Sequence, residues 1–235
     1  MLIEVCVDSA AGLAAAVAGG AGRIELCAAL EVGGLTPSAG LMQLAAGCGV
    51  PVFAMIRPRA GDFVYSAAEL ALMQADIAQA RQAGLAGVVL GASATDGRLD
   101  GPALHRLVTA AEGMGLTLHR AVDLVPDLAE AVELAVELGF ARILSSGQAV
   151  RAEDGLAVLA RLVELAVGRL SIMPGAGISA ANAARFVALG VTELHASCSA
   201  PVPVQGAVAR LGFAGPGLRQ TQVAAVQALC AAVTH

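Results

Sequence analysis

The chain has 235 residues, of which 57% are hydrophobic and 14% are charged, and its formal net charge is −5. This length and apolar content exclude a disordered chain and suit a single α/β barrel domain over residues 1–235. The negative charge argues against nucleic-acid binding, which needs clustered positive charge. The sequence contains no lysine, so every mechanism through a lysine Schiff base is excluded.

The longest stretch without a charge, residues 32–56, is long enough to cross a membrane. Because Pro37, Pro51 and several glycines interrupt it, we expect a loop, a helix and a strand there instead. No basic N-terminal region precedes an apolar block and a cleavage site, so we expect no secretion. Five cysteines without framework spacing fit a reducing compartment. We therefore predict a cytoplasmic protein with no membrane partner.

Short apolar runs alternate with Ala/Leu-rich segments of helical period along the chain. The runs expected to form strands are 2–7, 23–27, 51–57, 86–91, 116–120, 141–145, 170–173 and 192–196. Helical segments between them, such as 66–84 and 127–139, often end at a glycine, as helix C-caps do. The Pro/Gly-rich stretch 199–217 predicts a long loop before a C-terminal helix.

Eight alternations predict parallel strands joined by helical crossovers, and eight such strands close a (β/α)8 TIM barrel. A doubly wound open sheet is the alternative. The junction CVDSAAGLAAA after the first strand, however, lacks the glycine-rich dinucleotide fingerprint of that fold. We therefore predict the TIM barrel as a single domain.

The first two strands both place a glutamate two residues before a cysteine. Since alternate strand residues face opposite ways, Glu4, Cys6, Glu25 and Cys27 should face the barrel axis. The same alternation directs inward Arg57, His119, Glu193, His195 and Ser197. A buried charge is costly unless it is paired, so we expect ion pairs inside the barrel. Such a polar interior is typical of a ligand or active site.

Seven motifs between residues 3 and 199 occur in a specific order: EVCVDS, AGRIELCAALEVGGLTPS, MIRPRAGDFVYS, LTLHRAVD, RILSSGQ, MPGAGIS and ELHAS. In these motifs the sequence resembles the CutC family, named for copper homeostasis. The resemblance implies a cytoplasmic eight-stranded barrel, a homo-oligomer (dimer or tetramer) and a role in copper handling. It also places Cys6 and Cys27 on the two cysteines proposed as copper(I) ligands. After Ser199 the match weakens.

The chemistry of the two cysteines is compatible with copper(I). Soft thiolates select this ion, and two can suffice for a nearly linear site. Neighbouring strands lie about 4.8 Å apart, close to the span of two metal–sulfur bonds in line. Cysteine is also among the most buried residue types without binding anything. Cys6 and Cys27 are therefore either metal ligands or structural filler.

Several residues at the expected C-terminal strand ends could bind a small anion. The glycine-rich loop MPGAGIS, the loop SSGQ, the end of the last strand and the arginine-rich loop IRPRAGDF supply the candidates. They are Arg59, Ser146, Gly147, Gly175, Gly177 and Ser197, with Arg57 adding charge on the same rim. Phosphate sites often occupy this part of a barrel. The alternative interpretation is that these loops are only tight turns with a helix cap.

Proton transfer gives a rival function. The candidate catalytic residues are Glu4, Glu25, Arg57, His119, Asp123 and His195, because carboxylates and imidazoles in a polar interior can acquire perturbed pKa values. They would serve a lysine-independent lyase, isomerase or hydrolase that acts on a small anionic or phosphorylated substrate. Three hypotheses stay open: a copper-binding protein, such an enzyme, or a scaffold whose polar interior is a structural ion-pair network.

Overall fold

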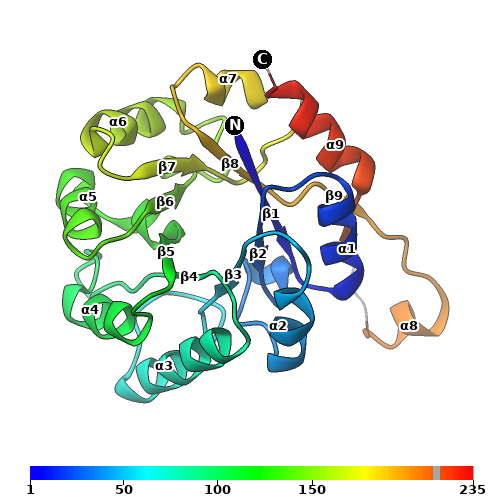
Figure 1. Ribbon diagram of the computed structural model, residues 1–235, viewed down its shortest axis with the longest axis horizontal. Helices are drawn as coiled ribbons and strands as arrows, with labels where there is room; N and C mark the ends of the chain where they lie inside the picture. Colours follow the sequence, from blue (N-terminus) through cyan, green and yellow to red (C-terminus); the bar gives the residue numbers. More distant parts are fainter. Residues whose placement is uncertain (214–217, 235) are drawn as a thin grey trace.

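The computed structural model describes residues 1–213 and 218–234, and its central feature is a ring of parallel strands (Figure 1). The strands are β1 Leu2–Val7, β2 Arg23–Leu26, β3 Val52–Met55, β4 Gly87–Leu90, β5 Gly115–Leu118, β6 Arg142–Ser145, β7 Ser171–Pro174 and β8 Glu193–Ala196. They pair in the order β7-β6-β5-β4-β3-β2-β1-β8, and β7 and β8 lie side by side where the ring closes. The (β/α)8 TIM barrel is confirmed, and the open doubly wound sheet is excluded.

Helices surround this ring (Figure 1). They are α1 Ala10–Ala18, α2 Ala39–Ala46, α3 Ala67–Gln82, α4 Gly101–Ala110, α5 Leu128–Glu137, α6 Leu156–Ala166, α7 Ala183–Val187 and α9 Val223–Ala232. The predicted helices at 66–84 and 127–139 are confirmed as α3 and α5. Local chemistry explains where α3 begins: Ser66 accepts a hydrogen bond from the Glu69 amide, and the Glu69 side chain accepts one from the Ser66 amide, which is a capping box.

The charge-free stretch 32–56 is not a membrane span. It contains the end of a short 3₁₀ helix, Leu30–Val32, followed by α2 and β3, so the prediction of a loop, a helix and a strand is confirmed. Among the helices of residues 1–213 and 218–234, none combines the length and the apolar content needed to cross a membrane.

The segment after the last barrel strand differs from its prediction as a long loop. It contains strand β9 (Ser199–Pro201), helix α8 (Gly206–Arg210) and strand β10 (Arg219–Thr221); residues 214–217 lie outside the described residues. β9 and β10 pair antiparallel, and α8 projects away from the barrel (Figure 1). Local composition could not reveal this pairing because three-residue strands separated by about twenty residues leave no periodic pattern.

The two faces of each barrel strand have opposite chemistry. Ile3, Val5, Ile24 and Leu26 belong to the large apolar core. The intervening residues Glu4, Cys6, Glu25 and Cys27 are buried on the inner face. The predicted alternation is therefore confirmed, and it concentrates charge and sulfur inside the ring.

Candidate functional site

The N-terminal half of the barrel interior holds two glutamates and two arginines that form ion pairs beside one aromatic ring. We call these five residues the barrel floor: Glu4, Arg23, Phe53, Arg142 and Glu193. Arg23 donates to both Glu4 and Glu193, and Arg142 Nε donates to Glu193 at 3.1 Å. Both guanidinium groups lie over the Phe53 ring, at 5.4 and 5.0 Å from its centroid. Every charge on the floor therefore has an opposite charge beside it.

Arg23 and Arg142 were not among the residues singled out from the sequence. A signal existed for Arg23, because it lies two residues before Glu25 and so shares its strand face. Arg142 begins β6, where position alone does not separate an inward arginine from an exposed one.

Above the floor, three ligand-type side chains from adjacent strands meet. One ligand atom each from Cys6, Glu25 and His195 lies within 4.8 Å of the other two, and all three residues are buried. The strand register explains the meeting, because Cys6 on β1 is paired with Glu25 on β2 and Glu4 on β1 is paired with His195 on β8. We call these residues the Cys6–Glu25–His195 group.

One hydrogen bond and a neighbouring carboxylate orient the imidazole of this group. The Nδ1 atom of His195 lies 2.8 Å from Glu4 Oε1, and its Nε2 atom lies 3.7 Å from Glu25 Oε2. Burial lowers the pKa of His195, but the charges of Glu25 and Cys6 and the bond to Glu4 outweigh it and raise this pKa well above its ordinary value. Burial raises the pKa of Glu4, but His195 and Arg23 outweigh it and bring this pKa to about 2. Burial raises the pKa of Glu25.

Cys27 lies outside the Cys6–Glu25–His195 group. Cys27 directly follows β2 and lies two residues after Glu25, one level further along the barrel axis. Its Sγ donates to Glu25 Oε2 at 3.5 Å. It packs with Phe53, Met55 and Val89 in a small apolar cluster. Burial raises the pKa of the Cys27 thiol well above its usual range. Copper ligation by Cys6 together with Cys27 stays a prediction.

A cavity of about 190 Å³ opens above this group at the C-terminal strand ends, and we call it the mouth cavity. Its polar lining is Cys6, Glu25, Arg57, His119, Arg120 and His195, and its apolar lining includes Met55, Phe63 and Leu144. The structure thus brings together five of the candidate residues that the sequence analysis singled out. Glu4 lies just below them, through its bond to His195.

Asp123 is not in the lining of the mouth cavity. Its carboxylate accepts hydrogen bonds from Ser145 Oγ at 2.6 Å, the Ser146 amide at 3.0 Å and the Gln148 amide at 3.2 Å. The Gly147 amide donates to Ser145 Oγ at 2.9 Å. The predicted anion loop SSGQ therefore already holds an internal anion, the Asp123 side chain, and an external anion at Ser146 and Gly147 would compete with it.

The other predicted anion-binding residues are spread over separate places. Arg59 bonds to Glu69 and Asp62. The Gly175 amide donates to Ser145 O at 2.9 Å, and Gly177, with a φ of +84°, packs against the Arg151 guanidinium. Ser197 lies with its Oγ 2.9 Å from Ser199 Oγ. An anion site formed by these residues stays a prediction.

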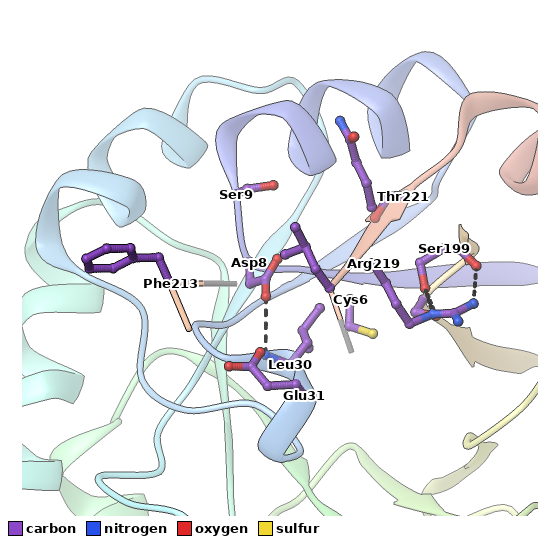
Figure 2. Close-up of a pocket in the computed structure, with 12 residues that line it drawn as sticks. Cys6, Asp8, Ser9, Leu30, Glu31, Ser199, Phe213, Arg219 and Thr221 are labelled. Carbon is purple, nitrogen blue, oxygen red and sulfur yellow. Dashed lines mark hydrogen bonds between the residues drawn. The ribbon is translucent and has the colours of Figure 1, made fainter. Parts of the chain in front are cut away.

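Cys6 also lines a second cavity, of about 380 Å³, which we call the outer pocket (Figure 2). Asp8, Ser9, Glu31 and the β9–β10 pair surround it, with Phe213 and Arg219 contributed by the C-terminal segment. Because Cys6 lines both cavities, its buried thiol is reachable from outside the barrel.

Comparison with known proteins places this chain in a family. The CutC family profile matches residues 1–200. A family protein CutC of Rhizobium meliloti (strain 1021) is 58% identical over 229 residues, which cover 97% of this chain and 94% of that protein. One from Vibrio campbellii is 50% identical over 199 residues, covering 83% of this chain and 81% of that protein.

Solved structures agree. The proposed copper homeostasis protein CutC of Streptococcus agalactiae is 34% identical, with a TM-score of 0.80 over 84% of this chain and 98% of that chain. A thiamine phosphate pyrophosphorylase from Pyrococcus furiosus, 16% identical with a TM-score of 0.61 over 99% of this chain and 95% of that chain, shares the fold alone. The chain belongs to the CutC family.

Proposed function

We propose that this protein binds a copper ion through Cys6, Glu25 and His195, within the copper homeostasis role that the name of the Streptococcus agalactiae relative indicates. The observation that carries the proposal is the meeting of one sulfur, one nitrogen and one oxygen ligand atom within 4.8 Å. The three atoms come from β1, β2 and β8, neighbours in the sheet. Rigid strands hold such atoms in place better than loops do.

The donor set fits copper. A soft thiolate selects copper(I), and imidazole also suits copper. His195 also has the outer support that metal-binding histidines need, because Glu4 Oε1 contacts its Nδ1 atom at 2.8 Å and leaves the other ring nitrogen for the metal. Arg23 in turn holds Glu4, so the barrel floor orients the ligand.

Access is the second requirement of a copper-handling protein, since copper must enter and leave. The outer pocket supplies a route to Cys6, and its wall carries the carboxylates of Asp8 and Glu31. These acidic groups would favour a cation on its way to the thiol. The route favours the Cys6–Glu25–His195 group as a site that exchanges its metal.

An anaerobic copper(I) competition titration tests the proposal with three variants: Cys6→Ser, Cys27→Ser and, as a matched control, Cys230→Ser on the outer helix α9. We expect one tight equivalent in the wild type, in Cys27→Ser and in Cys230→Ser, and its loss in Cys6→Ser. Circular dichroism checks that each variant is folded.

Other outcomes of this titration have definite meanings. Loss of the equivalent in both Cys6→Ser and Cys27→Ser would support the two-cysteine site instead. Equal binding by all four proteins would contradict any site at Cys6. Because His195 must lose its proton to bind a metal, the affinity should also rise with pH.

We propose a cytoplasmic location and a homo-oligomeric state for the protein, both resting on the sequence and its family resemblance.

A second candidate function, a lysine-independent enzyme acting on a small anionic substrate, is favoured by one observation. Three of the polar atoms in the mouth cavity lining are buried without a partner among the described residues.

A further inference from the structure

The mouth cavity contains polar atoms that protein groups do not satisfy. Glu25 Oε1, Arg57 Nε and His119 Nε2 are buried and have no hydrogen-bond partner among the described residues. The three residues are only 3%, 6% and 3% exposed, and all three line the same cavity. Buried polar groups are nearly always paired, so unpaired ones gathered around one cavity indicate a ligand that pairs them.

Arg57 brings a positive charge that forms no ion pair with a carboxylate of the described residues. Its Nη1 atom donates to Val32 O at 2.8 Å and Gly34 O at 3.1 Å, and its Nη2 atom donates to Gly61 O at 2.9 Å. These three acceptors are neutral backbone carbonyls, so they fix the guanidinium in place without supplying a negative charge. A buried charge without a counterion is costly, and an anionic ligand beside Nε would supply one.

His119 adds a second donor with a defined orientation. Its Nδ1 atom accepts a hydrogen bond from the Ala121 amide at 3.2 Å, so the ring proton is on Nε2. Burial, helped by the positive charge of Arg57, lowers the pKa of His119 to about 3, and the ring is neutral at pH 7. The His119 and Phe63 ring centroids are 4.7 Å apart, and Arg57 lies 5.1 Å from the centroid of the same Phe63 ring. Arg57 and His119 thus contribute two N–H donors to the lining of the same cavity.

Glu25 supplies the complementary group from β2. Its Oε1 atom can pair with a hydroxyl whether the carboxyl is ionised or protonated. The cavity volume of about 190 Å³ is below the range of roughly 300–1,000 Å³ that drug-sized ligands occupy. The ligand must therefore be small, with an anionic acceptor group, a hydroxyl and a short carbon body for the apolar lining.

We propose that the mouth cavity binds a small hydroxy-carboxylate, with its carboxylate toward Arg57 and His119 and its hydroxyl toward Glu25. This site uses atoms other than the copper site, apart from the shared side chain of Glu25. It gives the enzyme hypothesis a substrate class, and it does not require a metal.

Isothermal titration calorimetry on chelator-treated protein tests the proposal, with lactate as the probe and propionate as the same carbon chain without the hydroxyl. The variant is His119→Asn, because an asparagine oxygen can still accept from the Ala121 amide while the Nε2 donor is removed. The matched control is His105→Asn on the exposed part of α4. We expect saturable lactate binding by the wild type and the control, and affinity at least about tenfold lower in His119→Asn.

Four results would overturn the proposal. The first is no saturable binding of lactate up to tens of millimolar, and the second is lactate binding that is equal in His119→Asn. The third is equal affinity for propionate, which would remove the hydroxyl contact at Glu25. The fourth is tighter binding of inorganic phosphate than of lactate. Since metal is absent from this titration, its failure would leave the copper titration unaffected, and the reverse holds as well.

Discussion

The floor and the mouth of the same barrel treat their charged side chains in opposite ways. On the floor, Arg23 and Arg142 each contact a carboxylate, and both guanidinium groups lie over the Phe53 ring. At the mouth, the hydrogen bonds of Arg57 to the described residues go to backbone carbonyls, and the guanidinium lines a cavity. The difference teaches that polar residues inside a barrel can have two roles. Paired charges specify the structure, and unpaired charges indicate a ligand site.

The largest expected effect is the loss of stability that follows disruption of the barrel floor. The substitution Arg23→Met leaves Glu4 and Glu193 buried with less compensating charge, so we expect a loss of about 3–5 kcal/mol in unfolding free energy, measured by urea denaturation. The matched control is Arg161→Met in α6, whose partner Glu164 is exposed. It should change the stability by less than about 1 kcal/mol. Similar values for the two variants would contradict a structural role for the floor.

A smaller effect tests how tightly the floor is packed. A Cβ atom on Gly87 would lie 2.2 Å from the Phe53 ring and 2.5 Å from a backbone oxygen, so Gly87→Ala must displace the ring. We expect a loss of about 1–3 kcal/mol, measured by thermal and urea unfolding. Gly40→Ala in α2 is the control, because its Cβ meets nothing within 4 Å, and it should be neutral or stabilising. A neutral Gly87→Ala would show that the floor has room to adjust.

The smallest expected effect is a gradual change of stability with pH, which tests the environment of His119 at the mouth. The folded-state pKa of His119, about 3, lies below the unfolded value of roughly 6.5. Between these values the unfolded chain binds one more proton, so stability falls as the pH falls. The slope is about 1.4 kcal/mol per pH unit.

The stability difference between the wild type and His119→Asn isolates this contribution. Urea unfolding at several pH values between 6.5 and 4 should show the wild type losing stability relative to the variant as the pH falls. Parallel stability profiles for the two proteins would mean that folding does not lower the pKa of His119, which would contradict the burial of a neutral imidazole at the mouth.

The candidate site divides into a part that strand alternation could predict and a part that it could not. Alternation placed Glu4, Glu25 and His195 on the inner face, because side-chain direction along a strand has a period of two. It could not choose the partner of Cys6, since this depends on register. A shift of one pair between β1 and β2 decides whether Glu25 or a neighbouring residue faces the thiol.

Asp123 shows a second limit of local patterns. The sequence places it four residues after His119, which suggested a shared proton-transfer site. The fold turns it toward the SSGQ loop after β6 instead. Loops that follow different strands meet at the barrel rim only after the ring closes, so no local spacing specifies which loop receives the carboxylate.

The sequence by itself determined the strand and helix alternation, the barrel, the inward-facing polar residues and membership of the CutC family, because each of these depends on short-range periodicity or ordered motifs. Only the tertiary structure decided which inward residues meet. Register joined Cys6 to Glu25 and His195, ring closure left Arg57 and His119 beside one cavity, and long-range pairing built the β9–β10 wall. Contacts between residues far apart in the chain are set by packing in three dimensions, for which a single sequence carries no local signal.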